Sequence, residues 1–176
     1  MNRRLVMSAA DIDLAIQRIA LQILERNHDG GSLALVGIHT CGVYVARRIH
    51  EKLTARLGAP PAFGSLDINL YRDDWSLRSQ NPVVKTTDIS FVVDDTNLVL
   101  VDDVIFTGRT IRAAMDAIID YGRPRTIQLA ALVDRGGREL PIQPDFVGLA
   151  VGILPDERIR VLLDPQGSAG EVVLES

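Results

Sequence analysis

Cysteine and long apolar segments are scarce in this sequence. Cys41 is the single cysteine among 176 residues, which excludes an internal disulfide and a zinc site made of several cysteines. No run reaches the roughly 20 apolar residues that a membrane-spanning helix needs. The first residues also lack the apolar core of a secretory signal. We therefore expect a cytoplasmic protein.

The sequence has no strong excess of charge of either sign. It contains 19 Lys and Arg residues against 23 Asp and Glu residues, a formal net charge of −4. This balance gives no support to binding of nucleic acid through overall charge, although a local basic patch would suffice for it. The hydrophobic fraction of 47% is too high for a disordered chain. The length predicts one domain over residues 1–176.

Common nucleotide-binding and metal-binding signatures are also missing. The sequence contains neither a Gly-x4-Gly-Lys-[Ser/Thr] loop nor a Gly-x-Gly-x-x-Gly loop. It therefore lacks the usual signatures of kinases, GTPases and NAD-dependent enzymes. The three histidines, His28, His39 and His50, do not have the spacing of metal ligands.

Apolar periodicity alternates between helical and strand patterns along the chain. The helical pattern predicts helices over about 11–27, 46–57 and 111–119. Apolar runs predict strands at 33–36, 66–71, 98–101, 127–133, 146–151, 160–163 and 171–174, with a long polar loop at 72–90. Such alternation indicates an α/β fold with a largely parallel sheet flanked by helices. Ligands of these sheets bind beyond the carboxyl ends of the strands, where three loops should meet: 37–42, 102–110 and 134–139.

The segment from Leu98 to Thr110 indicates a site for a phosphorylated sugar. An apolar strand leads into Asp102 and Asp103, and a short turn containing Thr107, Gly108, Arg109 and Thr110 then opens a helix. The unpaired N–H groups of a helix N-terminus favour a phosphate, and threonine hydroxyls can donate to phosphate oxygens. Two adjacent carboxylates need partners, because burying them unpaired is costly. Sugar hydroxyls and a magnesium-bound diphosphate would supply those partners.

This segment resembles the phosphoribosyl pyrophosphate (PRPP) motif of type I phosphoribosyltransferases. The wider sequence resembles one family among them, the uracil phosphoribosyltransferases that double as pyrimidine operon attenuation regulators. Two of the matching stretches read Val-Asp-Asp-Val-Ile-Phe-Thr-Gly-Arg-Thr at 101–110 and Asp-Arg-Gly-Gly-Arg-Glu-Leu-Pro-Ile at 134–142. Further matches lie at 36–43 and 66–74, so the resemblance runs in order over most of the chain.

The resemblance implies a phosphoribosyltransferase fold with a small hood and a mobile loop, and it assigns roles to individual residues. In similar enzymes the acids corresponding to Asp102 and Asp103 hold the ribose 2′ and 3′ hydroxyls, and the turn corresponding to 107–110 holds the 5′-phosphate. The loop 37–42 would bind pyrophosphate, and Arg72, Asp73 and Asp74 would begin the mobile loop. The implied substrate-binding set is Thr40, Cys41, Arg72, Val104, Thr107, Gly108, Arg109, Thr110, Asp134 and Arg135, of which Asp134 and Arg135 would contact the base.

The implied activity converts uracil and PRPP into UMP and diphosphate. Mg²⁺ would be held mainly by the diphosphate and the ribose, and the protein would form a homodimer or a higher homo-oligomer. Two alternatives remain open. One is a nucleotide-sensing regulator that binds pyrimidine-operon leader mRNA and has weak or lost catalysis. The other is a transferase for a different base, because the motif at 98–110 is shared by enzymes for several bases.

The sequence departs from the family at positions that matter for both activities. Cys41 replaces an arginine that the family usually carries in the pyrophosphate loop, and a thiol cannot pair bidentately with phosphate. Several polar or basic positions of the RNA-binding relatives have also changed, and the residues found there are Leu21, Gly137, Gln143 and Leu149. The remaining candidates for RNA contact are Arg18, Arg26 and Arg138. Because each lost cation removes about one phosphate contact, the sequence supports catalysis better than RNA attenuation.

Overall fold

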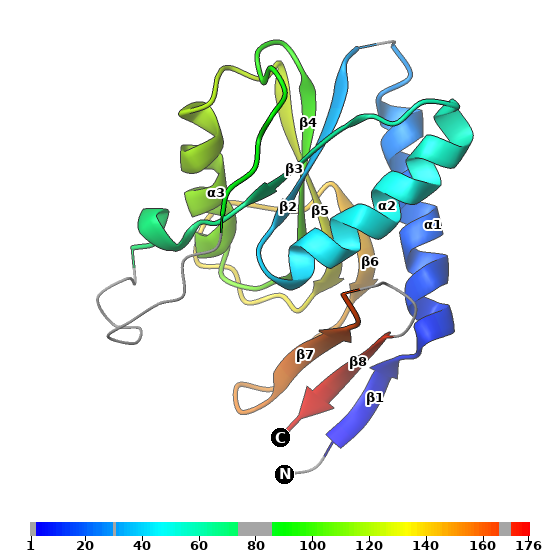
Figure 1. The fold of residues 1–176 in the computed structure, drawn as a ribbon. Coiled ribbons are helices and arrows are strands. Elements are labelled where there is room, and N and C mark those ends of the chain that lie inside the picture. Colours follow the sequence, from blue (N-terminus) through cyan, green and yellow to red (C-terminus); the bar gives the residue numbers. More distant parts are fainter. Residues whose placement is uncertain (1–2, 30, 74–85, 166–169) are drawn as a thin grey trace.

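The computed structural model describes residues 3–29, 31–73, 86–165 and 170–176. Its elements follow one another from an N-terminal strand to a C-terminal strand (Figure 1). They are β1 (Arg3–Met7), α1 (Ala9–Arg26), β2 (Leu33–Ile38), α2 (Cys41–Leu57), β3 (Ala62–Leu66), the 3₁₀ turn η1 (Asn69–Tyr71), β4 (Asn97–Ile105), α3 (Arg109–Ile119), β5 (Thr126–Asp134), β6 (Phe146–Ala150), β7 (Arg158–Leu163) and β8 (Gly170–Glu175).

Five of the strands form one parallel sheet, as the alternating pattern predicts. Their order is β3-β2-β4-β5-β6, and every neighbouring pair in it is parallel. Helices α1 and α2 cover one face of this sheet and α3 covers the other (Figure 1). The carboxyl ends of β2, β4 and β5 therefore lie along the same edge, where ligands bind in open parallel sheets.

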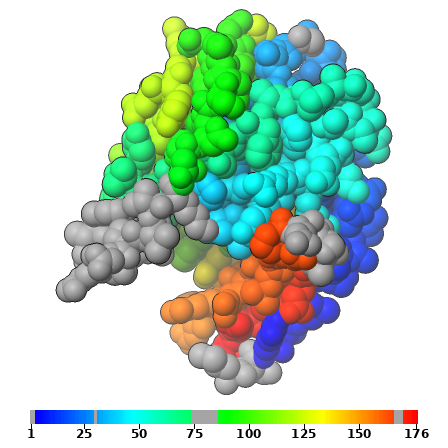
Figure 2. Space-filling view, in the orientation of Figure 1, coloured from blue at the N-terminus to red at the C-terminus, as the bar shows by residue number. Residues whose placement is uncertain are grey.

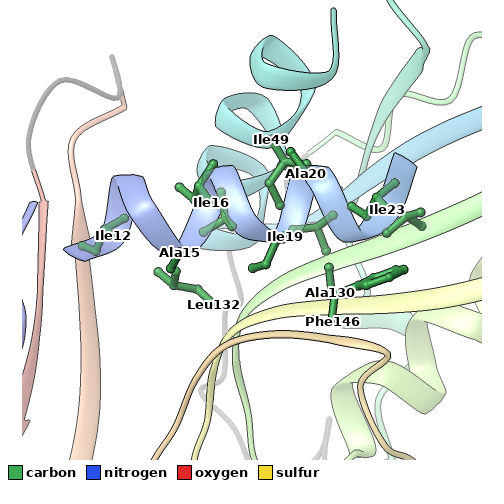
Figure 3. Close-up of a cluster of buried hydrophobic side chains, with 14 of the residues drawn as sticks. Ile12, Ala15, Ile16, Ile19, Ala20, Ile23, Ile49, Ala130, Leu132 and Phe146 are labelled. Carbon is green, nitrogen blue, oxygen red and sulfur yellow. The ribbon is translucent and has the colours of Figure 1, made fainter. Parts of the chain in front are cut away.

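Apolar side chains at helical spacing fix α1 against the sheet. Its buried residues face Ile49 of α2 and residues Ala130, Leu132 and Phe146 of the sheet (Figure 3). A capping box at Ser8 starts the helix: its hydroxyl accepts the Asp11 N–H at 3.2 Å, and the Asp11 carboxylate accepts the Ser8 N–H at 2.9 Å. The second core, on the other face of the sheet, contains the apolar side of α3.

The remaining strands form a small antiparallel sheet, the hood that the resemblance implied. Its order is β1-β8-β7, and it lies apart from the parallel sheet, beneath the N-terminal end of α2 (Figures 1 and 2). The Cys41 thiol lies 3.8 Å from the Val161 carbonyl oxygen of β7, which brings the start of α2 into contact with the hood. Strand β1 was missing from the sequence prediction, because its arginine-rich sequence shows no clean alternation.

One predicted strand is wrong. The alternation of residues 66–71 suggested a strand there, but β3 ends at Leu66 and residues 69–71 form η1. The Asp67 carboxylate accepts the Asn69 N–H at 2.9 Å, a local bond that competes with strand pairing. Leu70 is consequently 72% exposed. Most of the predicted 72–90 loop lies outside the described residues, as do Asp74 and Trp75. Within the described parts of the chain, the helices are too short or too polar to cross a membrane.

Candidate active site

Three loops meet at the carboxyl edge of the parallel sheet, as predicted. Gly42 lies so close to β4 that a Cβ atom there would be 2.7 Å from the Val101 carbonyl oxygen and 3.2 Å from an Asp102 carboxylate oxygen. Only glycine fits this approach without a shift of the backbone. On the other side, the Glu139 N–H donates to the Thr107 carbonyl oxygen at 3.0 Å. The loops 37–42 and 134–139 therefore flank the acidic segment.

The acidic pair lies inside β4 and not beyond its end. The sequence pattern placed the strand end at Asp102 and Asp103, but the ladder continues, with Asp102 opposite Ala131 and Ile105 opposite Asp134. The strand continues because Val104 and Ile105 still pair with β5. Asp102 is thereby 6% exposed, which makes its carboxylate a buried group.

Burial has the largest influence on the pKa values of this pair. It raises the pKa of the Asp102 carboxyl well above its usual range, and the neighbouring charge of Asp103 raises it further, while Arg72 acts in the opposite direction. Burial also raises the pKa of Asp103, although hydrogen bonds to its carboxylate oppose the shift. Carboxylates in such surroundings gain from hydroxyl donors or a cation. The pair is therefore suited to a ligand that supplies one or both.

A cleft of about 160 Å³ opens between Asp102 and the N-terminus of α3. Gly108, directly before α3, has no side chain to cap the helix, and Gly108, Thr110 and Ile111 line the cleft. The positive end of the helix dipole therefore lies at the cleft. Arg72 reaches the same place and donates to the Thr110 hydroxyl at 3.0 Å. The cleft is lined by Arg72, Asp102, Val104, Ile105, Phe106, Thr107, Gly108, Thr110 and Ile111.

This cleft joins the Asp102 carboxylate with donors for an anion, which suits a ribose bearing a 5′-phosphate. A larger hollow of about 710 Å³ lies at the opposite end of the sheet, between residues 24–33 and 57–62. Its lining contains no Lys or Arg side chain among the described residues, so it offers a diphosphate no permanent positive charge.

The guanidinium of Arg109 is bonded to residues outside the turn at 107–110, here called the phosphate turn because we predict that it holds the 5′-phosphate. It pairs with Glu139 at 2.7 Å and with Asp73 at 2.5 Å, and these bonds raise its pKa. Its backbone N–H donates to the Thr107 hydroxyl at 3.3 Å. The side chain of Arg109 thus links the start of the 72–90 segment to the loop that follows β5.

Asp134 and Arg135, the predicted base contacts, lie beside Ile105 and Phe106, the two residues before the phosphate turn. The Arg135 guanidinium stacks on the Phe106 ring, 3.8 Å from its centroid, and burial lowers its pKa. Burial alone would raise the pKa of Asp134, but hydrogen bonds from Arg138 and the Gly136 N–H outweigh it and lower that pKa. Asp134 is therefore held as an anion. The Arg135 Nε–H is buried and has no partner among the described residues.

The predicted pyrophosphate loop contains a residue that sequence reasoning left unassigned. His39 precedes Thr40 and Cys41, and its Nε2 atom is buried with no hydrogen-bond partner in the described part of the chain. Its N–H donates to the Leu66 carbonyl oxygen at 3.0 Å. The spacing of the histidines predicts no metal site at His39, and no cluster of three metal-binding side chains occurs in the described residues. Phe106 and Glu139 were also missed. Phe106 lies inside the 98–110 segment but was given no role, and only the fold brings Glu139 to Arg109.

The three arginines predicted to contact RNA lie in two places. Arg18 and Arg26 are on α1 beside the edge strand β6. Arg18 donates to the carbonyl oxygens of Val147 and Gly148, and Arg26 pairs with Asp145 at 2.8 Å. Arg138 belongs to the active-site edge, and its side chain is 12% exposed.

Comparison with known proteins identifies the family. The model of the phosphoribosyl transferase domain matches residues 8–153. The bifunctional protein PyrR of Syntrophobacter fumaroxidans is 51% identical over 172 residues, covering 98% of this chain and 92% of the relative. That of Geobacter sulfurreducens is 52% identical over 170 residues, covering 97% and 96%.

Solved structures agree on the fold. A hypoxanthine phosphoribosyltransferase from Trypanosoma cruzi superposes with a TM-score of 0.72 at 16% identity, covering 98% of this chain and 91% of that one. A second structure of that enzyme gives a TM-score of 0.71 at 15% identity, covering 97% and 95%. At these identities the likeness concerns the fold alone. The family match and the near full-length relatives place the chain among the phosphoribosyltransferases, in the group of bifunctional PyrR proteins.

Proposed function

We propose that the protein is a uracil phosphoribosyltransferase that also regulates pyrimidine genes through leader RNA. The observation that supports catalysis most directly concerns the acidic pair. Asp102 lies against Gly42 of the 37–42 loop, and it lines the same cleft as Thr107, Gly108 and Thr110. In the reaction, the uracil nitrogen N1 forms a bond to C1 of PRPP while the bond from C1 to the diphosphate oxygen breaks. The N1 proton is released, and the products are UMP and diphosphate.

Each part of the site has one task in this displacement. Asp102 and Asp103 accept hydrogen bonds from the ribose 2′ and 3′ hydroxyls, and their charge favours the positive character that develops at C1. The amides of the phosphate turn, at 107–110, hold the 5′-phosphate. Thr40 and its neighbours hold the diphosphate, and Asp134 and Arg135 bind the base. Most of the rate enhancement then comes from positioning, with water kept away from the activated sugar.

Mg²⁺ fits this site as a companion of the substrate. Magnesium usually keeps few protein ligands and binds through one or two carboxylates together with substrate phosphates. The adjacent residues Asp102 and Asp103 supply such carboxylates, and the described residues contain no cluster of three metal-binding side chains. When bound, the ion neutralises the leaving diphosphate.

Pyrophosphate release from PRPP and Mg²⁺ tests the catalytic proposal. We expect release to depend on uracil and to be absent with hypoxanthine, guanine or adenine. Release with one of these other bases would assign the site to a different transferase. No release with any base, from protein that still binds UMP, would favour the regulator with lost catalysis.

Cys41→Arg is expected to lower the KM for PRPP by about ten-fold. The substitution returns a bidentate cation to the loop that we propose binds diphosphate, and a charge-assisted hydrogen bond of this kind contributes about 1.5–3 kcal/mol. Cys41→Ser is the matched control, because it changes the thiol without adding charge, and its KM should stay near that of the wild type. An unchanged KM for the arginine variant would show that the diphosphate binds away from residue 41.

RNA binding is proposed for the surface formed by α1 and β6. Arg18 and Arg26 both contact the β6 region, because Arg18 donates to the Val147 and Gly148 carbonyl oxygens and Arg26 pairs with Asp145. The side chain of Arg26 is 54% exposed, so its charge can reach a phosphate. We expect pyrimidine-operon leader RNA to bind more tightly with UMP present. Binding that ignores UMP and stays at the non-specific level at all salt concentrations would contradict this role.

Self-association is the last part of the proposal. Exposed apolar side chains such as Leu70, Val92 and Ile119 would gain from burial between subunits. We therefore propose a homodimer or a higher homo-oligomer. Light scattering at micromolar concentration measures the mass directly, and a monomer would contradict it.

A further inference from the structure

Arg138 holds the loop that follows β5 in a closed form. Residues 134–143, here called the 134–143 loop, turn back across Phe106, and Arg138 lies at its centre with a side chain 12% exposed. An arginine has five N–H donors, and five acceptors within the protein surround this one. They are the Ile142 carbonyl at 2.9 Å from Nε, the Phe106 and Gly136 carbonyls at 2.9 and 3.5 Å from Nη1, and the Asp134 carboxylate and Gln143 amide oxygens at 2.7 and 3.4 Å from Nη2.

This arrangement conflicts with a role in RNA contact. A phosphate that approached Arg138 would have to displace internal acceptors from a side chain with little exposed surface. Arg26 offers the contrast, because more than half of its side chain is exposed and a single carboxylate pairs with it. The structure therefore separates Arg138 from the RNA-binding candidates on α1.

A second observation shows how closely the loop is fitted to Phe106. Gly137 has φ +74°, and a Cβ atom there would lie 2.5 Å from Cε2 of the Phe106 ring. Arg135 stacks on the same ring at 3.8 Å. Phe106 immediately precedes the phosphate turn, so any movement of its ring or carbonyl is passed to Thr107.

Backbone hydrogen bonds of the residues after Arg138 also join the 134–143 loop to the phosphate turn. The N–H groups of Glu139 and Leu140 both donate to the Thr107 carbonyl oxygen, at 3.0 and 3.2 Å. The Glu139 carboxylate accepts from Arg109 at 2.7 Å. The 134–143 loop is thus bonded to Phe106, Thr107 and Arg109 in succession.

We infer that Arg138 is a positioning residue that fixes the 134–143 loop to the phosphate turn, so that base recognition and phosphate binding share one rigid unit. The inference rests on the proposed function, because the loop presents Asp134 and Arg135 to the base. Arg138 touches no substrate. It orients the Asp134 carboxylate and fills the space behind the loop, and the loop in turn keeps Thr107 in place. Uracil and UMP then meet a loop that is already ordered.

Arg138→Gln tests the inference by its effect on base and nucleotide binding. We expect the KM for uracil and the Kd for UMP to rise by about ten- to a hundred-fold, since small misplacements of binding groups have effects of this size. The kcat at saturating uracil should change much less. Arg138→Lys keeps the charge and up to three donors, so it should recover part of the loss. Arg125→Gln, which breaks the exposed ion pair with Asp95, is the matched control and should behave as wild type.

Amide hydrogen exchange provides a readout that does not need activity. In the ligand-free protein, Arg138→Gln should accelerate exchange at Glu139 and Leu140, the amides that donate to Thr107. Gly137→Ala, which crowds Phe106 without removing Arg138, should do the same and serves if Arg138→Gln fails to fold. Unchanged exchange with unchanged UMP affinity would overturn the inference, and so would weaker RNA binding as the sole effect. If wild-type protein shows no uracil-dependent turnover, the proposed function fails while exchange still tests the loop.

Discussion

Asp103→Asn is expected to lower the kcat for UMP formation by about 10²- to 10³-fold while the protein stays folded. Asparagine keeps the shape of the side chain and can still accept a hydrogen bond from a ribose hydroxyl. It removes the negative charge that stabilises the positive character developing at C1, and the loss of one preorganised electrostatic group commonly has an effect of this size. Steady-state kinetics at saturating PRPP measures it.

The control is an exposed aspartate in the second half of α3. Asp116 lies on α3, pairs with Arg112 at 3.3 Å and is exposed, so Asp116→Asn should leave the kcat unchanged. Thermal unfolding should give similar midpoints for both variants and the wild type. If Asp103→Asn keeps the wild-type kcat, the acidic pair has only a structural role and the proposed chemistry is wrong.

Asp102→Asn is expected to stabilise the ligand-free protein at pH 7 to 8 by about 1–3 kcal/mol, the usual cost of an inadequately paired buried group. For a chain of this length such a gain corresponds to roughly 3–10 °C in Tm. The reason is the burial of Asp102 beside Asp103, which raises the pKa of its carboxyl well above its usual range. Ionisation of this carboxyl therefore destabilises the folded protein, whereas asparagine does not ionise.

The sign of the pH dependence follows from the same shift. In the unfolded chain the Asp102 carboxyl titrates at about pH 3.9, and in the folded protein it titrates higher. The folded state thus binds the proton more tightly, and its contribution to stability is lost as the pH rises through the folded pKa. Between pH 5 and pH 8, the difference in Tm between the Asp102→Asn variant and the wild type should increase in favour of the variant as the pH rises. A constant difference between the two would contradict this explanation.

The main features of the fold could be read from apolar periodicity. Buried parallel strands such as β4 and β5 are nearly continuous apolar runs, and the apolar stripes of α1 and α3 give a clear helical period. The failure at 66–71 had a local cause, because an alternating pattern cannot reveal that the Asp67 side chain bonds to the next backbone turn. Strand β1 pairs with the other end of the chain, a contact that no local pattern contains.

The candidate site could be predicted only where its residues are consecutive. Asp102 to Thr110 form one segment, so their pattern indicates phosphate chemistry directly. The position of Phe106 under Arg135, and of Arg138 among five acceptors, depends on how β5 returns toward β4. Resemblance alone made Arg138 an RNA contact, because a family motif gives a residue type and not the direction in which its side chain points.

The hood joins the two most distant parts of the sequence. Arg3 pairs with Glu175 in the register of β1 and β8, so completing this sheet closes a loop that contains almost the whole chain. The entropy lost in closing a loop grows with its length, and contacts of such separation form late. The parallel sheet and its phosphate turn can therefore assemble before the hood does. A folding chain would acquire its binding site for the sugar phosphate first, and the antiparallel sheet that joins its two ends last.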